Sequence, residues 1–240
     1  MPVKVLDELN GGSGAFSWII AGILYAADNG ADVINMSLGA IIPQGIGPDS
    51  PFVANLRVAV NNAITYAQQR GATVIVSAGN DELDLNSPEA ASLINFNAFA
   101  SQAISISGVG PHGWALDPST SLTERSFYTN VGPEVDFSGP GGDVDFGLAA
   151  TGNLCRVAGI VQFCYVFDFV FSTGNGGWYW SIGTSMAAPH AAGIAAIIIG
   201  ENGGSMNPSL VAREMRRRAL DLGKPGGDDL HGSGAVNTGY

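Results

Sequence analysis

The sequence predicts an α/β fold in which a mostly parallel, doubly wound sheet is covered by helices on both faces. Short apolar runs alternate with longer helical patterns along the chain, which is typical of parallel sheets. The short runs are almost wholly apolar, as parallel strands buried on both sides are. The 240 residues are 46% hydrophobic and only 13% charged, which suits one tightly packed domain over residues 1–240.

The expected strands are short runs rich in β-branched residues. They are Val3–Leu6, Asp32–Asn35, Ala72–Ser77, Ile104–Val109 and Val135–Phe137. The stretches Asp81–Ala103 and Pro111–Gly177 show no clear periodicity, so we expect long loops there with a binding or regulatory role.

The expected helices have an apolar face at helical spacing or a clear start signal. They are Phe16–Asn29, Phe52–Arg70, Ser185–Gly200 and Pro208–Leu220. Gly71 suits the position just after the second helix, and Asn207 suits the cap that precedes Pro208 in the last one.

The charge balance excludes several classes of partner. The formal net charge is −11, which argues against nucleic acid and anionic membranes because the cations that neutralise phosphates are missing. The local basic cluster of Arg213 and Arg216–Arg218 is interpreted as a solvated helix face. The longest apolar stretch, Met186–Ile199, contains Pro189 and His190 and is shorter than the roughly 18 residues of a membrane span.

The most specific signal is the run Gly183-Thr184-Ser185-Met186-Ala187-Ala188-Pro189-His190. Gly183 permits a tight approach to a helix start, and Ser185 then lies at the helix N-terminus. Unpaired backbone N–H groups and the helix dipole at that end stabilise a developing oxyanion. Pro189 is tolerated in the first turn, and the helix that follows is apolar all round, so it should be buried.

This run resembles the nucleophile motif of the subtilisin-like serine proteases, the subtilases. The resemblance covers nearly the whole chain, and further segments carry it. They are Ser17–Ile20, Asp32–Gly39, Val74–Asn80, Ser126-Phe127, Gly132–Asp136, Pro140-Gly141 and His231–Asn237. The resemblance implies the C-terminal part of a subtilase catalytic domain whose N-terminal portion is missing.

The resemblance also implies roles for individual residues. Ser185 would be the nucleophile of an endopeptidase, and the side-chain amide of Asn80 would join the Ser185 backbone N–H in the oxyanion hole. Three segments would bind a protein or peptide substrate, the first of them by pairing with it as a β-strand. They are Gly12-Ser13-Gly14, Ser37-Leu38-Gly39 and Ser77-Ala78-Gly79.

The sequence lacks a candidate for the catalytic base. A serine hydroxyl is a weak nucleophile without one. In the family that the chain resembles, the base comes from a His-Gly-Thr-His-like motif and its orienting Asp from an Asp-Thr/Ser-Gly motif, and neither occurs here. His112, His190 and His231 are all expected to be structural. We therefore expect a missing N-terminal segment that carries the Asp and His, and an isolated chain that is inactive and poorly soluble or partly molten.

Cys155 and Cys164 leave two interpretations open, which are a short-loop disulfide and two buried thiols. The family resemblance favours the disulfide and a secreted protein, although no signal peptide opens the chain. No cofactor is expected. One oxygen-rich loop is either a solvated acidic surface or a structural calcium site. Its members are Asp81, Glu82, Asp84 and Asn86.

Two other functions compete with this interpretation. Gly183-x-Ser185-x-Ala187 loosely mimics the nucleophile elbow of an α/β-hydrolase, and Asp221 or Asp228 followed by His231 would complete the order Ser, Asp, His. The separation of Ser185 and His231 decides that alternative. The other function is that of a non-catalytic, protease-like fragment or peptide-binding pseudoenzyme.

Overall fold

A central sheet of mainly parallel strands organises the computed structural model, which describes residues 1–7, 9, 11–39, 41–42, 50–88, 90, 94–95 and 100–239. The strands β1 (Val33–Met36), β3 (Thr73–Ser77), β5 (Ile104–Gly110) and β7 (Phe137–Pro140) pair in parallel in that spatial order. The short β6 (Glu124–Arg125) pairs antiparallel with the end of β5. This arrangement confirms the predicted α/β class.

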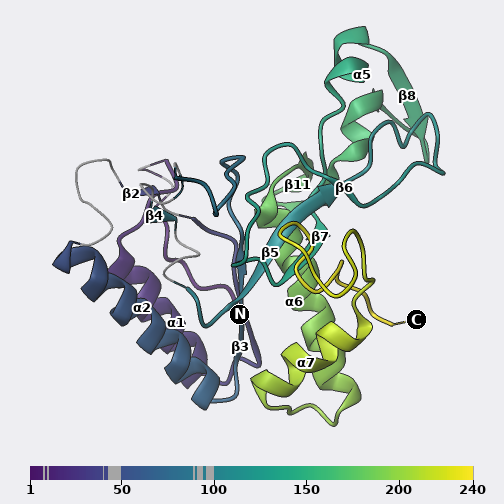
Figure 1. Cartoon of the computed structure of the whole chain (residues 1–240). Helices are drawn as coiled ribbons and strands as arrows, with labels where there is room; N and C mark the ends of the chain where they lie inside the picture. The colour runs from purple at the N-terminus through teal and green to yellow at the C-terminus, as the bar shows by residue number, and fades with distance from the viewer. Residues whose placement is uncertain are drawn as a thin grey trace.

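Helices cover both faces of the sheet (Figure 1). The helices α1 (Phe16–Asp28) and α2 (Pro51–Gln69) lie on one face, and α6 (Thr184–Glu201) and α7 (Pro208–Arg218) on the other. Alternate residues of β3 point to opposite sides, so Val74 and Val76 join the core beneath α1 and α2. Ile75 between them joins the core beneath α6 and α7.

The four predicted helices are confirmed to within two residues at each end. Ser50 caps α2 by accepting a hydrogen bond from the Val53 N–H, and Asn207 caps α7 in the same way through the Ser209 N–H. Among the described part of the chain, no helix is long and apolar enough to cross a lipid bilayer.

Two predicted strands need correction. Val3–Leu6 forms no strand, because this apolar run packs against α1 instead of pairing. Val5 lies so close to the helix that a Cβ on Gly22 would meet Val5 Cγ1 at 2.5 Å. The strand predicted at Val135–Phe137 begins only at Phe137. In both cases the apolar pattern marked residues that pack against other elements, and packing does not identify a strand partner.

The predicted loop at 111–177 is largely ordered structure. After β6 and β7 come α5 (Phe146–Thr151), the hairpin of β8 (Leu154–Val157) and β9 (Ile160–Phe163), and the 3₁₀ helix η2 (Cys164–Asp168). A second hairpin, β10 (Val170–Gly174) with β11 (Gly177–Ser181), returns the chain to α6. We call residues 144–169 the disulfide module, and its α5 and β8 project from the rest of the molecule in Figure 1.

The disulfide module was missed because its strands show no one-sided pattern. Leu154, Ile160, Val161 and Phe163 are all exposed, so neither an alternating nor a wholly buried pattern marks them. In the other predicted loop, Asp81–Ala103, the described residues include β4 (Ile94–Asn95), which pairs antiparallel with β2 (Ile41–Ile42). The rest of that prediction lies partly outside the described residues.

Candidate active site

Ser185 is the second residue of α6 and lies at its N-terminus, as the sequence predicted. Gly183 precedes the helix with a φ of +142°, a backbone conformation that favours glycine. The Ser185 carbonyl accepts a hydrogen bond of 2.7 Å from Ser37 Oγ. The serine itself is half-buried and lines a pocket of about 490 Å³ together with Met186, Pro189 and others. The nucleophile candidate is therefore both fixed and accessible.

Asn80 reaches the same helix N-terminus from the end of β3. Its Oδ1 accepts hydrogen bonds from the backbone N–H and from Oγ1 of Thr184, each 2.9 Å long. An ideal Cβ on Gly183 would lie 3.5 Å from Asn80 Nδ2, so the amide donors lie beside the turn that carries Ser185. The structure thus brings the predicted oxyanion pair together, with the Asn80 side chain held by the residue next to the serine.

Thr184 has a positioning role that the sequence analysis missed. Besides donating to Asn80, its Oγ1 accepts the Gly79 N–H at 3.1 Å. Gly79 has a φ of +102°, which lets the chain turn sharply between β3 and Asn80. The sequence signal that could have indicated this role is the position of Thr184 directly before Ser185.

Asn130 is a second residue that sequence reasoning missed. It is fully buried, and its Oδ1 accepts the backbone N–H groups of Asp81 and Leu83 at 3.0 Å each. Its Nδ2 donates to the Ala78 carbonyl at 3.1 Å. These bonds lock the turn that contains Asn80 from a segment about fifty positions away, and no local pattern in the sequence announces such a contact.

Two of the three predicted substrate-binding segments lie next to each other beside Ser185. Ser37 contacts the Ser185 carbonyl, and Ser77 Oγ donates to the Leu38 carbonyl at 3.2 Å. These contacts hold Ser37–Gly39 against Ser77–Gly79 at the carboxyl ends of β1 and β3, where ligands of parallel sheets bind.

The third segment, Gly12-Ser13-Gly14, folds onto its own neighbourhood. The Ser13 carbonyl accepts the Asp7 N–H at 2.8 Å, and the Gly12 N–H donates to the Asp7 carbonyl at 3.0 Å. Gly14 passes so close to the Val5 carbonyl that no Cβ would fit. Pairing of this segment with a substrate strand stays a prediction.

All three histidines have partners other than Ser185. His190 Nδ1 lies 2.8 Å from the Met186 carbonyl, although its side chain lines the same pocket as the serine. His112 Nε2 lies 2.8 Å from an Asp143 carboxylate oxygen. In the described part of the chain, no histidine is hydrogen-bonded to the Ser185 hydroxyl.

His231 is buried, and its Nδ1 lies 2.8 Å from Ser138 Oγ. Burial lowers the pKa of His231, so the ring is neutral at pH 7. The α/β-hydrolase alternative required the His231 imidazole to lie beside Ser185, but the ring lies beside Ser138 instead.

Side chains of the acidic loop after Asn80 form hydrogen bonds with residues outside the loop. Asp81 Oδ2 accepts from Asn130 Nδ2 at 3.1 Å, and Asn86 Nδ2 donates to Asp229 Oδ2 at 3.2 Å. Among the residues that the structure describes, no three histidine, cysteine or acidic side chains converge on a metal position. A calcium ion at this loop stays a prediction.

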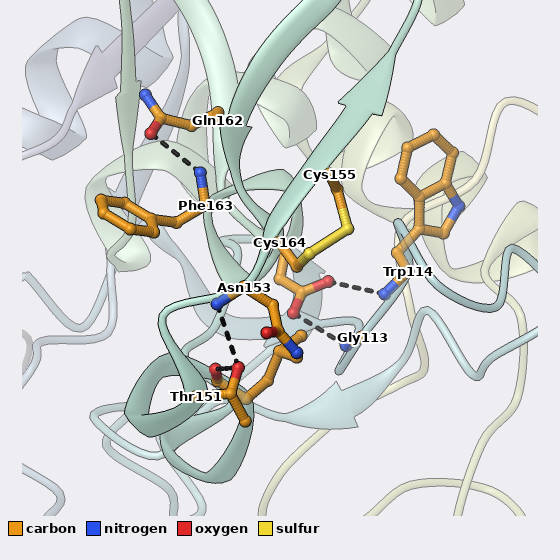
Figure 2. The surroundings of a disulfide bond; sticks show 10 residues. Gly113, Trp114, Thr151, Asn153, Cys155, Gln162, Phe163 and Cys164 are labelled. Atoms are coloured by element: carbon orange, nitrogen blue, oxygen red, sulfur yellow. Dashed lines mark hydrogen bonds between the residues drawn. A yellow bond between two sulfur atoms is a disulfide. The ribbon is translucent and has the colours of Figure 1, made fainter.

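Cys155 and Cys164 form a disulfide, as the family resemblance favoured (Figure 2). The bond joins β8 to the start of η2 and closes a loop with a sequence separation of 9. Within the disulfide module, it therefore links the β8–β9 hairpin to the start of η2.

The fold and the site define an α/β protein that holds a serine and an asparagine amide together at the head of a buried helix. A solved lanthipeptide protease is 26% identical and superimposes with a TM-score of 0.73 over 98% of this chain and 67% of its own. The epidermin leader peptide processing protease EpiP of Staphylococcus aureus, 21% identical, shows the same fold with a TM-score of 0.74 over 95% of this chain and 54% of its own.

The chain belongs to the Subtilase family, which matches it over residues 1–234. Subtilisin DY of Bacillus licheniformis and Subtilisin E of Bacillus subtilis strain 168 are each 30% identical to it over 98% of this chain. The chain spans 65% of the first relative's length and 47% of the second's. These findings confirm the family resemblance.

Proposed function

We propose that this chain is the nucleophile-bearing part of a subtilisin-type serine endopeptidase, which hydrolyses peptide bonds through an acyl-enzyme on Ser185. The observation that carries the proposal is the double hydrogen bond from Thr184 to Asn80 Oδ1. It fixes an amide donor beside the nucleophile at the head of a buried helix, where negative charge is stabilised.

In the proposed reaction, Ser185 Oγ attacks the scissile carbonyl carbon and the carbonyl oxygen becomes an oxyanion. The Ser185 backbone N–H and Asn80 Nδ2 donate hydrogen bonds to that oxygen. A base takes the hydroxyl proton and then gives it to the leaving amine, after which water hydrolyses the acyl-enzyme. The chemistry needs no cofactor, but it does need a base.

We infer that the base and its orienting carboxylate come from a segment that carries the family's His and Asp motifs. The involvement of all three histidines elsewhere supports this inference. So does the outer edge of β1, which has no strand partner among the described residues. A groove of about 480 Å³, lined by Val3, Val5, Ile34 and others, runs between that edge and the N-terminal segment. An apolar strand would pair with β1 there.

The proposed substrates are proteins or peptides, bound in extended form along Ser37–Gly39 and Ser77–Gly79. Two solved relatives in fold are described as leader peptide proteases, EpiP and the nisin leader peptidase NisP of Lactococcus lactis. We also propose that the protein is secreted, because the disulfide persists in an oxidising environment.

Labelling by a fluorophosphonate tests the proposal. Three proteins are compared, which are the chain alone, a joined protein in which a segment with the Asp and His motifs precedes Met1, and the joined protein with Ser185→Ala. We expect the joined protein to be labelled, and the chain alone and the Ser185→Ala form to remain unlabelled. With a peptide substrate, Ser185→Ala should lower the kcat of the joined protein by about 10⁶, the size found in subtilisin.

Two outcomes contradict this mechanism. A folded joined protein that labels no faster than its Ser185→Ala form removes Ser185 as the nucleophile. Rapid labelling of the chain alone shows that the base lies within residues 1–240 after all. Circular dichroism of each protein confirms folding before labelling.

A non-catalytic peptide-binding role is the second candidate, and the involvement of every histidine elsewhere favours it. In that case the chain alone binds extended peptides, as measured by tryptophan fluorescence, and the joined protein releases no product from them.

A further inference from the structure

The nucleophile turn rests on a crossing of two backbones that has no room for side chains. The Gly183 N–H donates to the Gly141 carbonyl at 3.0 Å. A Cβ on Gly141 would lie 3.0 Å from the Gly183 carbonyl oxygen and 2.6 Å from Tyr128 Oη. Tyr128 in turn donates to the Gly142 carbonyl at 2.7 Å, and burial raises its pKa to about 12, which keeps it a donor.

Asp143 follows this crossing directly and is fully buried. One oxygen of its carboxylate accepts the Val144 N–H at 2.7 Å and the Phe127 N–H at 3.3 Å. The other lies 2.8 Å from His112 Nε2. A buried carboxylate needs such partners, since it is costly to leave unpaired. His112 is therefore the partner of one Asp143 oxygen, and backbone N–H groups hold the other.

The turn that carries His112 holds a second buried carboxylate. The Gly113 and Trp114 N–H groups each donate to Asp168 at 2.8 Å, bonds that can be followed in Figure 2. The Asp143 N–H donates to the Asp168 carbonyl at 3.2 Å. Residues 112–114, which we call the clamp, thus contact Asp143 just before the disulfide module and Asp168 near its end. Asp143 is also where the chain leaves the crossing beneath Gly183.

We propose that His112 and Asp143 are positioning residues for Ser185, a role that rests on the proposed function. Their hydrogen bond fixes the segment 141–143, and the Gly141–Gly183 bond passes that position to the helix start. Because the crossing is backbone against backbone, a shift of Asp143 is transmitted to Gly183 instead of being taken up by a flexible side chain.

The pair can be altered without opening the core. The His112 side chain is 45% exposed, whereas the Asp143 side chain that it contacts is 1% exposed. Replacing His112 therefore removes the contact to Asp143 from the solvent side and leaves the buried packing in place.

The first test compares backbone amide signals of the parent and its variants by NMR. It uses the chain alone, or the joined protein if the chain gives no dispersed spectrum. We expect His112→Ala to move the Gly183 and Ser185 signals. His112→Gln keeps a donor to Asp143 and should leave these signals close to their parent positions, as should Asp117→Asn, an exposed change in the same loop.

The second test measures kcat and KM of the joined protein. We expect His112→Ala to lower kcat by about 10- to 100-fold through misplacement of the nucleophile, with KM within about twofold, and His112→Gln to restore most of it. Asp117→Asn is again the control.

The inference fails if a folded His112→Ala variant leaves the Gly183 and Ser185 signals at their parent positions, or if His112→Gln moves them as far as His112→Ala does. Equal kcat in the parent and in a folded His112→Ala variant also overturns it. If the joined protein labels no faster than its Ser185→Ala form, the proposed function has failed, and the NMR test alone then decides whether the clamp positions this turn. If His112→Ala does not fold, His112→Phe, which keeps a ring but removes the donor to Asp143, takes its place in both tests.

Discussion

Beneath Ser185, glycine backbone and fully buried polar groups meet at hydrogen-bond distance, whereas the disulfide module beside it leaves large apolar side chains in solvent. Leu154 is 64% exposed, while Ser126, Thr129 and Asp143 are fully buried. The crossing is held by many weak bonds between segments distant in sequence. In the module, the β8–β9 hairpin is closed by a disulfide, and η2 is held by its buried side chains and by residues 112–114. We conclude that the position of the nucleophile depends on packing, while the exposed hairpin of the module depends on its covalent bond.

In the region beneath Ser185, kcat should be most sensitive to the loss of the Asn80 amide, which is proposed to bind the oxyanion. In the joined protein, Asn80→Ala removes the amide held by Thr184, and we expect kcat to fall by about 10² to 10³, the size found for the equivalent loss in subtilisin. Asn86→Ala, an exposed asparagine of the neighbouring loop, is the control. A fall of less than twofold for Asn80→Ala would exclude Asn80 from the oxyanion hole.

The module should be most sensitive to loss of its covalent bond. Replacing Cys155 and Cys164 with serine should lower the stability of the module by about 2–3 kcal/mol, because the closed loop is short. Hydrogen exchange of residues 154–168 should rise, and that of the β3 and β5 amides should not. Reductant applied to the serine variant is the control. A uniform rise throughout the sheet would show that the two regions unfold as one unit.

Two glycines distinguish tight from open packing. We expect Gly141→Ala to destabilise the fold by about 1–3 kcal/mol, since its Cβ would meet Tyr128 and the Gly183 carbonyl. Gly193→Ala, in the exposed middle of α6 with no neighbour within 4 Å, should stabilise it by up to about 1 kcal/mol. Urea unfolding of both variants measures the difference. Equal effects would mean that the crossing is not tight.

The smallest expected effect is a pH dependence from His231. Burial lowers its pKa in the folded state, so its contribution to stability is present above the unfolded value of about 6.5 and is lost as the pH falls below it. The Tm of the parent should therefore drop more between pH 7 and 5 than that of His231→Asn. His190→Gln removes an exposed histidine as the matched control. Parallel curves for the parent and His231→Asn would contradict this origin.

Much of the fold followed from local patterns. The four long helices and the strands at 33–36, 73–77 and 104–110 were predicted from apolar spacing and caps, because a buried helix or strand must show its buried face in sequence. The strand expected at Val3–Leu6 was wrong, since apolar residues pack against a helix as readily as they join a sheet.

The disulfide module and the clamp could not be predicted in this way. Their contacts join residues far apart, such as His112 with Asp143 and Trp114 with Asp168, and leave apolar side chains exposed. Neither the spacing of apolar residues nor a motif carries information on such pairs.

The sequence by itself determined that Ser185 heads a buried helix and that Asn80 follows a buried strand, because both facts depend on neighbours along the chain. Only the tertiary structure decided that Thr184 grips Asn80, that Asn130 locks the turn, and that each histidine has a partner other than the serine. Hydrogen bonds between distant segments form only once the sheet has brought strand ends together, so local patterns contain no record of them.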